Sequence, residues 1–284
     1  MRRLWITVLA LALCGTAPGR DSSPAEVLRA QQEALGARLA RNDFGRPLVI
    51  ESEEGDEDIS GDVFAVVDHP FSALSESMKT PAQWCEVVMM VINIKRCQPT
   101  EAGVTLNVGR KADQPIQDTY LLKFAHRVVA DAADYMQVRM GAADGPFGTH
   151  DYRIVLEAVP SGAERSFVHL RYSYGTGMAA RLAFQGYLST LGRNKVGFSV
   201  VGHDGDGHPE YVRGTRGAIE RTTMRYYLAI STYLDSLATP SDQRVDARLR
   251  SWFAATERYA RQLHEMDEGE YLSMKRRELR SAAG

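Results

Sequence analysis

The spacing of apolar residues between Arg213 and Leu237 predicts one long amphipathic helix. A straight helix over this range would be about 37 Å long. At 100° per residue, one broad face collects Ile219, Thr223, Tyr226, Tyr227, Ile230, Leu234 and Leu237. A face this wide needs a large apolar surface to cover it. Met224 and Leu228 lie on the otherwise polar back, so we expect a second neighbour there.

Before this helix the pattern changes to a period of two, which is typical of strands. Two strand-like runs, residues 46–53 and 58–68, are joined by the acidic turn EGDED, and two short helices are expected at 70–79 and 81–90. Further strands are expected at residues 91–97, 103–110, 119–129, 135–141, 152–159, 166–174 and 196–202. The short connections between most of these strands favour an antiparallel meander.

Helices are expected at both ends of this region. Ser23 and Pro24 form an N-cap and a first helical turn, and the helix ends near Asn42. After Pro240, apolar residues at helical spacing continue to Leu263, and the basic end is expected to fray. We therefore expect a core domain over residues 46–238, an N-terminal helix within 20–45 and a helical extension over 239–284.

A further segment, residues 178–191, has helical spacing between flanking glycines and interrupts the strands. It is interpreted either as a flap over the mouth of a cavity or as a simple crossover between two strands.

Residues 1–19 have the order of a secretory signal: a positively charged start, an apolar run and a small-residue cleavage region. We expect cleavage after Gly19 and export, into the periplasm if the host is a Gram-negative bacterium. No later segment approaches the roughly 20 apolar residues of a transmembrane helix.

Cys14 would be removed with the signal, which leaves Cys85 and Cys97. An even number of cysteines in an oxidising compartment predicts a disulfide between them, with two buried thiols as the alternative. A lipid anchor on Cys14 is a second alternative for the mature protein, although Leu13 is bulky where a small residue is preferred.

Composition narrows the function only slightly. The chain of 284 residues is 44% hydrophobic and 25% charged, as in ordinary globular proteins. A net charge of −2, with no basic strip interleaved with aromatic residues, gives no indication of nucleic-acid binding.

Catalytic and metal motifs are weak in this sequence. There is no GxSxG motif, and His126 and His169 fall in strands with opposite parity, so they are not expected to converge. The segment GHDGDGHPEY, residues 202–211, places two aspartates and two histidines close together, but its glycines more simply predict a polar turn. Glu220 is expected to form a local surface ion pair with Arg216 or Arg221. We assign no catalytic residue, no metal and no cofactor, and the sequence leaves enzymatic activity undecided.

The order of these elements resembles the START-like superfamily, which also contains polyketide cyclases and plant allergen lipid carriers. The resemblance is carried by GDVFAVVDHPFSAL and TPAQWCEVV for the first strand and paired helices, and by RGAIERTTMRYYLAISTYL for the long helix. It spans about residues 58–238. It implies an α+β helix-grip fold, in which a curved antiparallel sheet wraps around a long C-terminal helix, here with extra helices at both ends.

The resemblance also implies a hydrophobic cavity between the sheet and the long helix, holding a lipid, sterol, quinone or polyketide-like molecule. Alternation and helical spacing supply the expected lining: Trp84, Tyr120, Leu122, Phe124, Met136, Val138, Ile154, Leu156, Leu170, Tyr172, Ile219, Tyr226 and Ile230. The same residues would also make a filled core. Three hypotheses therefore stand: a carrier or binding protein, a cyclase- or hydrolase-type enzyme using the same cavity, and an interaction module of the cell envelope with a filled core.

Overall fold

The computed structural model describes residues 22–110, 114–177, 186 and 194–283. The expected signal at residues 1–19, with Cys14, and nearly all of the helical segment at 178–191 lie outside the described residues. No helix in the described ranges combines the length and the apolar character needed to cross a membrane.

Eight strands form one antiparallel sheet, at the positions β1 (Leu48–Glu54), β2 (Asp58–Val67), β3 (Ile94–Thr100), β4 (Gly103–Val108), β5 (Tyr120–Asp131), β6 (Met136–Asp144), β7 (Thr149–Pro160) and β8 (Ser166–Thr176). Their order across the sheet is β1-β2-β8-β7-β6-β5-β4-β3. From β3 to β8 each strand pairs with the next one in the chain, which confirms the predicted meander. The first hairpin is then added beside the last strand, β8.

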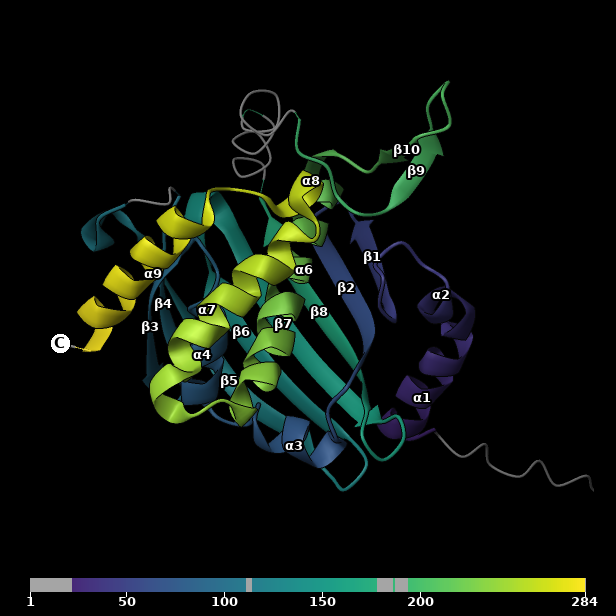
Figure 1. The fold of residues 1–284 in the computed structure, drawn as a ribbon, viewed down its shortest axis with the longest axis horizontal. Coiled ribbons are helices and arrows are strands. Elements are labelled where there is room, and N and C mark those ends of the chain that lie inside the picture. Colours follow the sequence, from purple (N-terminus) through teal and green to yellow (C-terminus); the bar gives the residue numbers. More distant parts are fainter. Residues whose placement is uncertain (1–21, 111–113, 178–185, 187–193, 284) are drawn as a thin grey trace, which may run out of the picture.

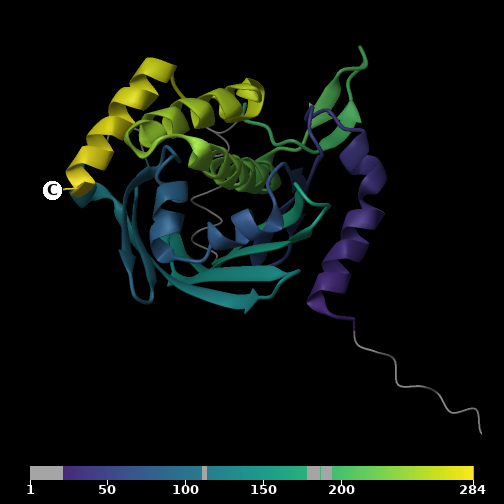
Figure 2. The ribbon, with the colours of Figure 1, turned by 60° about the horizontal axis from the view of Figure 1, so that its bottom comes forward.

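The helices are α1 (Pro24–Ala34), α2 (Gly36–Ala40), α3 (Phe71–Glu76), α4 (Pro81–Val88), α6 (Gly214–Asp235), α7 (Ser241–Glu257), α8 (Ala260–Leu263) and α9 (Glu268–Ala283). Short 3₁₀ turns occur at Ile116–Asp118, Pro146–Gly148 and Ser236–Ala238. The long helix α6 crosses one face of the curved sheet, and α7 and α9 lie further out over it (Figures 1 and 2). The element order and pairing confirm the predicted α+β helix-grip architecture.

Close packing of α6 on β2 depends on a missing side chain. A Cβ atom added at Gly61 would lie 2.5 Å from Oγ1 of Thr223, on the facing side of α6. Heavy atoms do not approach so closely, so only glycine permits this helix–sheet distance without a shift.

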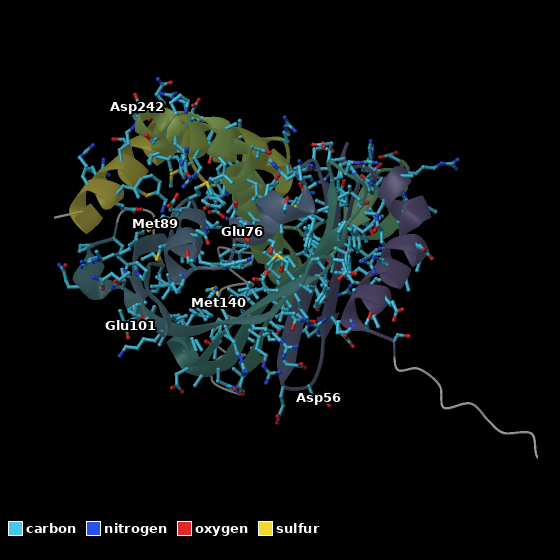
Figure 3. All side chains as sticks on the ribbon, turned by 90° about the horizontal axis from the view of Figure 1, so that it is seen from below. Asp56, Glu76, Met89, Glu101, Met140 and Asp242 are labelled. Carbon is cyan, nitrogen blue, oxygen red and sulfur yellow. A yellow bond between two sulfur atoms is a disulfide. The ribbon has the colours of Figure 1, made fainter. Side chains whose placement is uncertain are left out.

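The interior between the sheet and the helices is filled largely by apolar side chains. Residues at alternating positions of β5 to β8 point into it, and Met140 on β6 is 2% exposed there (Figure 3). This burial confirms the predicted inward parity of the middle strands. In contrast, Asp56 lies in the exposed β1–β2 turn at the edge of the molecule, as expected for a solvated acidic turn (Figure 3).

The back of α6 is covered as well. Met224 and Leu228 are fully buried, and Trp252 on α7 donates a hydrogen bond from Nε1 to the carbonyl of Arg225 at 3.4 Å. The apolar pair on the back of the predicted helix therefore does indicate a second neighbour, which is α7.

The other face of the sheet carries α1 and α2 (Figure 2). Leu28 and Leu39 belong to a separate apolar cluster with Phe64 and Phe167, whose side chains leave β2 and β8 on the side away from α6. A capping box between Ser23 and Glu26 fixes the start of α1, as the sequence predicted for the N-cap.

Two expectations at the C-terminal side are wrong. The predicted strand at residues 196–202 is not part of the large sheet: only β9 (Val200–His203) forms, and it pairs with β10 (Pro209–Tyr211) in a separate hairpin. Both sides of β8 are already occupied by β2 and β7, so no edge is available next to it.

The end of the described chain is helical and packed, although fraying was expected. Lys275 on α9 is fully buried and donates from Nζ to the carbonyl of Ile94 at 2.7 Å and to Glu278 at 2.9 Å. Burial lowers the pKa of Lys275 to about 8. The apolar residues that hold α9 down, Tyr271, Leu272 and Met274, directly precede a basic run, and this obscured the amphipathic pattern.

Cys85 on α4 and Cys97 on β3 form a disulfide, with their Cα atoms 5.3 Å apart. The predicted pairing is therefore present in the structure. The bond closes the segment that runs from α4 into the sheet.

Candidate functional site

A cavity of about 480 Å³ lies between the inner face of the sheet and α6. Its apolar wall comes from the α4–β3 connection and from β4 and β5, and includes Val91, Ile92, Leu106, Leu122 and Phe124. The disulfide between Cys85 and Cys97 brackets the first of these segments. Part of this wall therefore belongs to a covalently closed loop.

Four tyrosines form the opposite wall. Tyr152, Tyr172 and Tyr174 come from β7 and β8, and Tyr226 comes from α6. The ring centroids are 5.3 Å apart for Tyr152 and Tyr174, 5.8 Å for Tyr172 and Tyr174, and 5.5 Å for Tyr172 and Tyr226. Such distances are typical of aromatic clusters, so the four rings stabilise one another.

The hydroxyl groups of this cluster differ in their partners. The Tyr152 hydroxyl lies 2.7 Å from Oγ1 of Thr149. Among the described residues, no hydrogen bond engages the hydroxyls of Tyr172, Tyr174 and Tyr226. Burial raises the pKa of all four tyrosines, that of Tyr226 to about 12. The hydroxyls therefore stay protonated at neutral pH and can donate hydrogen bonds.

A charged cluster stands at another side of the cavity. Glu265, in the α8–α9 connection, accepts from Arg225 on α6 and from Lys195, each at 2.7 Å. Burial raises the pKa of Glu265, but the nearby cations Arg225 and Lys195 outweigh it and the pKa is lowered. This carboxylate ties three separate segments together beside the cavity.

Phe147 lies at the rim of the cavity with a left-handed backbone, at a φ of 60°. Its side chain is 53% exposed and its ring centroid is 5.2 Å from that of Tyr120. Non-glycine residues rarely adopt this conformation, which here turns a large apolar ring outward.

The thirteen predicted lining residues are divided between the cavity and the core. Leu122, Phe124, Tyr172 and Tyr226 line the cavity. Tyr120 is half-buried beside Phe147. The other eight are packed in the filled apolar core: Trp84, Met136, Val138, Ile154, Leu156, Leu170, Ile219 and Ile230. The open volume thus occupies one part of the space between sheet and helix, and side chains fill the rest.

Sequence reasoning missed several lining residues. Tyr152 and Tyr174 have the same strand parity as Ile154 and Tyr172, so extending the alternation by two residues would have found them. Arg225 follows Met224, which the sequence places on the back of the helix, and yet it lines the cavity at the α6 edge. No local pattern indicated Glu265 and Met266, which reach the cavity from a connection outside the predicted core domain.

Glu220 does not form the predicted surface ion pair. It is fully buried, and its carboxylate accepts hydrogen bonds from Ser52 Oγ and Ser199 Oγ, both at 2.7 Å, and from the backbone amides of Phe198 and Ser199. Arg221 is also buried and donates to the carbonyl of Val196 at 3.1 Å. The two side chains anchor the segment that precedes β9, because a buried carboxylate requires such donors.

His169 lies on the outer face of the sheet, away from the cavity. Its ring nitrogens are 2.7 Å from Asp62 and 2.8 Å from Glu157, and its ring stacks on Phe64 at 4.3 Å. Burial lowers the pKa of His169, but the hydrogen bonds to the two carboxylates outweigh this and raise it. Both ring nitrogens of His169 therefore have hydrogen-bond partners nearby, and His126 on β5 is not one of them.

The loop between β9 and β10 is a tight polar turn. Asp204 accepts hydrogen bonds from the backbone amides of Asp206 and His208, at 3.0 and 2.9 Å. Asp204, Asp206 and His208 could together face a cation, but all three are exposed. We assign no metal site to this loop.

The sequence matches no family model and no curated protein. Among solved structures, it is similar to norcoclaurine synthase from Thalictrum flavum, with 12% identity, a TM-score of 0.33, and 51% of this chain and 81% of that chain covered. A START superfamily protein from Mycobacterium smegmatis matches with 12% identity and a TM-score of 0.30, over 48% of this chain and 92% of that chain. Ara h 8.0201 matches with 10% identity and a TM-score of 0.35, over 66% of this chain and 99% of that chain. The order and pairing of its own elements give this chain the α+β helix-grip fold that the sequence predicted.

Proposed function

We propose that this protein binds a hydrophobic small molecule in the cavity between sheet and α6. The observation that carries the proposal is the cavity itself: about 480 Å³, with an apolar wall facing tyrosine hydroxyls that lack partners among the described residues. Its volume is within the usual range of ligand sites, which are mostly apolar with a few orienting polar groups.

The tyrosine hydroxyls narrow the ligand chemistry. Because Tyr172, Tyr174 and Tyr226 remain protonated, they offer hydrogen-bond donors along one wall. A ligand with acceptor oxygens on a flat apolar body would accept hydrogen bonds from them. Among the expected classes (lipid, sterol, quinone and polyketide-like molecules), the quinones and aromatic polyketides fit this requirement best.

Binding is favoured over catalysis by the kinds of residues present. Among the described lining residues there is no histidine, cysteine or lysine that could act as a general base or nucleophile. The carboxylate of Glu265 accepts hydrogen bonds from both Arg225 and Lys195. We therefore propose a carrier or binding protein, and a chemically altered ligand after incubation would contradict this.

The C-terminal extension is proposed to be part of the binding unit. Glu265 and Met266 line the cavity, and Trp252 and Tyr271 belong to the same apolar core as α6. Removing residues 239–284 should therefore abolish ligand binding as well as lower stability.

Native mass spectrometry of the purified protein, followed by extraction, tests the function. We expect a co-purifying apolar molecule, or saturable binding from a panel of lipids and quinones. The double variant Tyr172→Phe/Tyr226→Phe should bind the same ligand about tenfold or more weakly, while Tyr211→Phe, on the exposed hairpin, should not differ from wild type. Protein that stays empty against the whole panel would refute the proposal.

We also propose that the protein is exported, on the strength of the signal-like residues 1–19 and the disulfide between Cys85 and Cys97. Fractionation of the native host should find the protein outside the cytoplasm with its N-terminus at Arg20. A mature N-terminus at a lipid-modified Cys14 would instead indicate anchoring, and an uncleaved cytoplasmic protein would contradict export.

A further inference from the structure

A second concave surface lies outside the cavity. This arginine groove, of about 560 Å³, runs between the connection from α2 to β1, the β9–β10 hairpin and the end of α7. Four arginines line it: Arg38, Arg41, Arg258 and Arg261. The single carboxylate among its described lining residues is Asp43. With Asp43 and Glu51, the partner of Arg38, both counted against the four guanidinium groups, a local excess of two positive charges remains in a chain whose net charge is −2.

One wall of the arginine groove is aromatic. The rings of Phe44, Phe198 and Tyr259 contact one another pairwise, with centroids 5.7 to 6.1 Å apart. The Tyr259 hydroxyl donates to the carbonyl of Phe44 at 2.9 Å, which fixes this wall to the N-terminal segment. The groove therefore offers a rigid apolar surface beside its cations.

The arginines differ in how they are held. Arg38 pairs with Glu51, and the guanidinium of Arg261 lies 4.9 Å above the ring of Tyr211. Stacking on a ring leaves the N–H groups at the edge of a guanidinium available. In the described part of the chain, no ion pair or side-chain hydrogen bond engages Arg41 or Arg258. The groove thus has both positioned and uncommitted guanidinium groups.

We propose that the arginine groove binds a phosphate group carried on an apolar or aromatic body. Guanidinium groups bind phosphate through paired, charge-assisted N–H···O bonds. A phosphate has more oxygens than a carboxylate, so it can accept from several guanidinium groups at once. The aromatic wall of Phe44, Phe198 and Tyr259 takes the organic part of the ligand. A soluble phosphate ester and a lipid headgroup share this chemistry.

This site is distinct from the cavity, although one segment contributes to both. Arg258 and Arg261 line the groove, whereas Glu265 and Met266, a few residues further on, line the cavity. The groove needs no occupied cavity, so the proposal does not rest on the function proposed above.

Calorimetric titration of the purified protein with 1-naphthyl phosphate tests the proposal. We expect saturable binding, at least tenfold tighter than that of 1-naphthol or of inorganic phosphate alone. The first control lacks the phosphate group, and the second lacks the aromatic body. Arg258→Gln/Arg261→Gln should weaken binding of 1-naphthyl phosphate at least tenfold. The matched double variant Arg153→Gln/Arg165→Gln removes the same charge from exposed positions outside the groove and should leave binding unchanged.

Two further variants separate the alternatives. Arg41→Gln changes an exposed residue at the end of α2, and it should weaken binding severalfold even if the double variant folds poorly. Tyr172→Phe/Tyr226→Phe should leave binding of 1-naphthyl phosphate unchanged, since it alters only the cavity. Equal loss of affinity in both arginine double variants, or no saturable binding by wild type, would overturn the proposal.

Sedimentation with phosphatidylcholine vesicles, with and without phosphatidic acid, identifies the source of the phosphate. Binding that requires phosphatidic acid and is lost in Arg258→Gln/Arg261→Gln indicates a lipid headgroup. Binding of 1-naphthyl phosphate without any vesicle binding indicates a soluble phosphate ester. Vesicle binding that the arginine substitutions do not change would count against the groove.

Discussion

The ring of Tyr172 on β8 lies 5.5 Å from the ring of Tyr226 on α6, centroid to centroid. This contact joins the sheet to the long helix at the cavity, and both hydroxyls lack hydrogen-bond partners among the described residues. Neither hydroxyl is among the buried polar atoms that lack a partner, so both donors are open to water or to a ligand in the cavity. The pair is therefore the most direct place to test ligand binding.

Replacing either tyrosine by phenylalanine keeps the ring contact and removes one donor. We expect Tyr172→Phe to weaken binding of 1,4-naphthoquinone about fivefold, the effect of roughly one lost hydrogen bond. Binding of naphthalene, which has the same ring body without oxygens, should not change. Calorimetry with both ligands checks this. An equal loss of affinity for the two would show that the hydroxyl does not donate a hydrogen bond to the ligand oxygens.

Glu220 is expected to stabilise the segment that leads into β9. Glu220→Gln keeps the shape but removes the charge that accepts from the amides of Phe198 and Ser199, and it replaces by an NH₂ group one of the two oxygens that accept from these amides and from the hydroxyls of Ser52 and Ser199. We expect the free energy of unfolding to fall by about 1–3 kcal/mol in urea denaturation. Glu53→Gln, an exposed change of the same kind on β1, should have little effect. Unchanged stability of Glu220→Gln would contradict the assigned hydrogen bonds.

His169 should make stability depend on pH. Its pKa is raised above the ordinary 6.5 because, although burial lowers it, the hydrogen bonds to Asp62 and Glu157 favour the imidazolium, in which both ring nitrogens donate. When the pKa of a histidine is raised in the folded state, its contribution to stability is fully present at pH below the pKa of the unfolded state. The contribution is lost as the pH rises through the pKa of the folded state.

The measurement is urea denaturation of wild type and His169→Gln between about pH 6 and pH 9. The advantage of wild type over the variant should be largest at the acid end of this range and shrink toward its alkaline end. The exposed His203→Gln variant serves as the control and should follow wild type throughout. An advantage that grows with pH would mean that the neutral imidazole is the stabilised form.

The disulfide should support both stability and the cavity wall. Removing it with Cys85→Ala/Cys97→Ala should lower the free energy of unfolding by about 3 kcal/mol, mainly by freeing the unfolded chain. Because Val91 and Ile92 lie within the closed loop and line the cavity, ligand affinity should fall as well. Thiol titration of the oxidised wild type provides the check, and two reactive thiols would contradict the bond.

Patterns within single elements were enough for much of the fold. The alternation within the strands between Leu122 and Tyr172 predicted which side chains point inward, because successive side chains of a strand leave opposite faces of the sheet. The apolar spacing of residues 213–237 predicted a long helix covered on its broad face, and Met224 with Leu228 predicted a second neighbour. The cysteine count predicted the disulfide that joins α4 to β3.

The tertiary structure alone decided where space remains and which charges are buried. Eight predicted lining residues fill the core because α4 and α6 reach the sheet beside them, and no sequence pattern reports such a distance. Glu220 has a charged neighbour in sequence, which suggests a surface pair, but its real partners, Ser52 and Ser199, are remote in the chain. Arg38 and Arg258 are also far apart in sequence, and they share the arginine groove because α2 and the segment after α7 both border it. Periodicity determines which face of an element is buried, whereas cavities, buried carboxylates and charged grooves arise from several elements and exist only once these have packed.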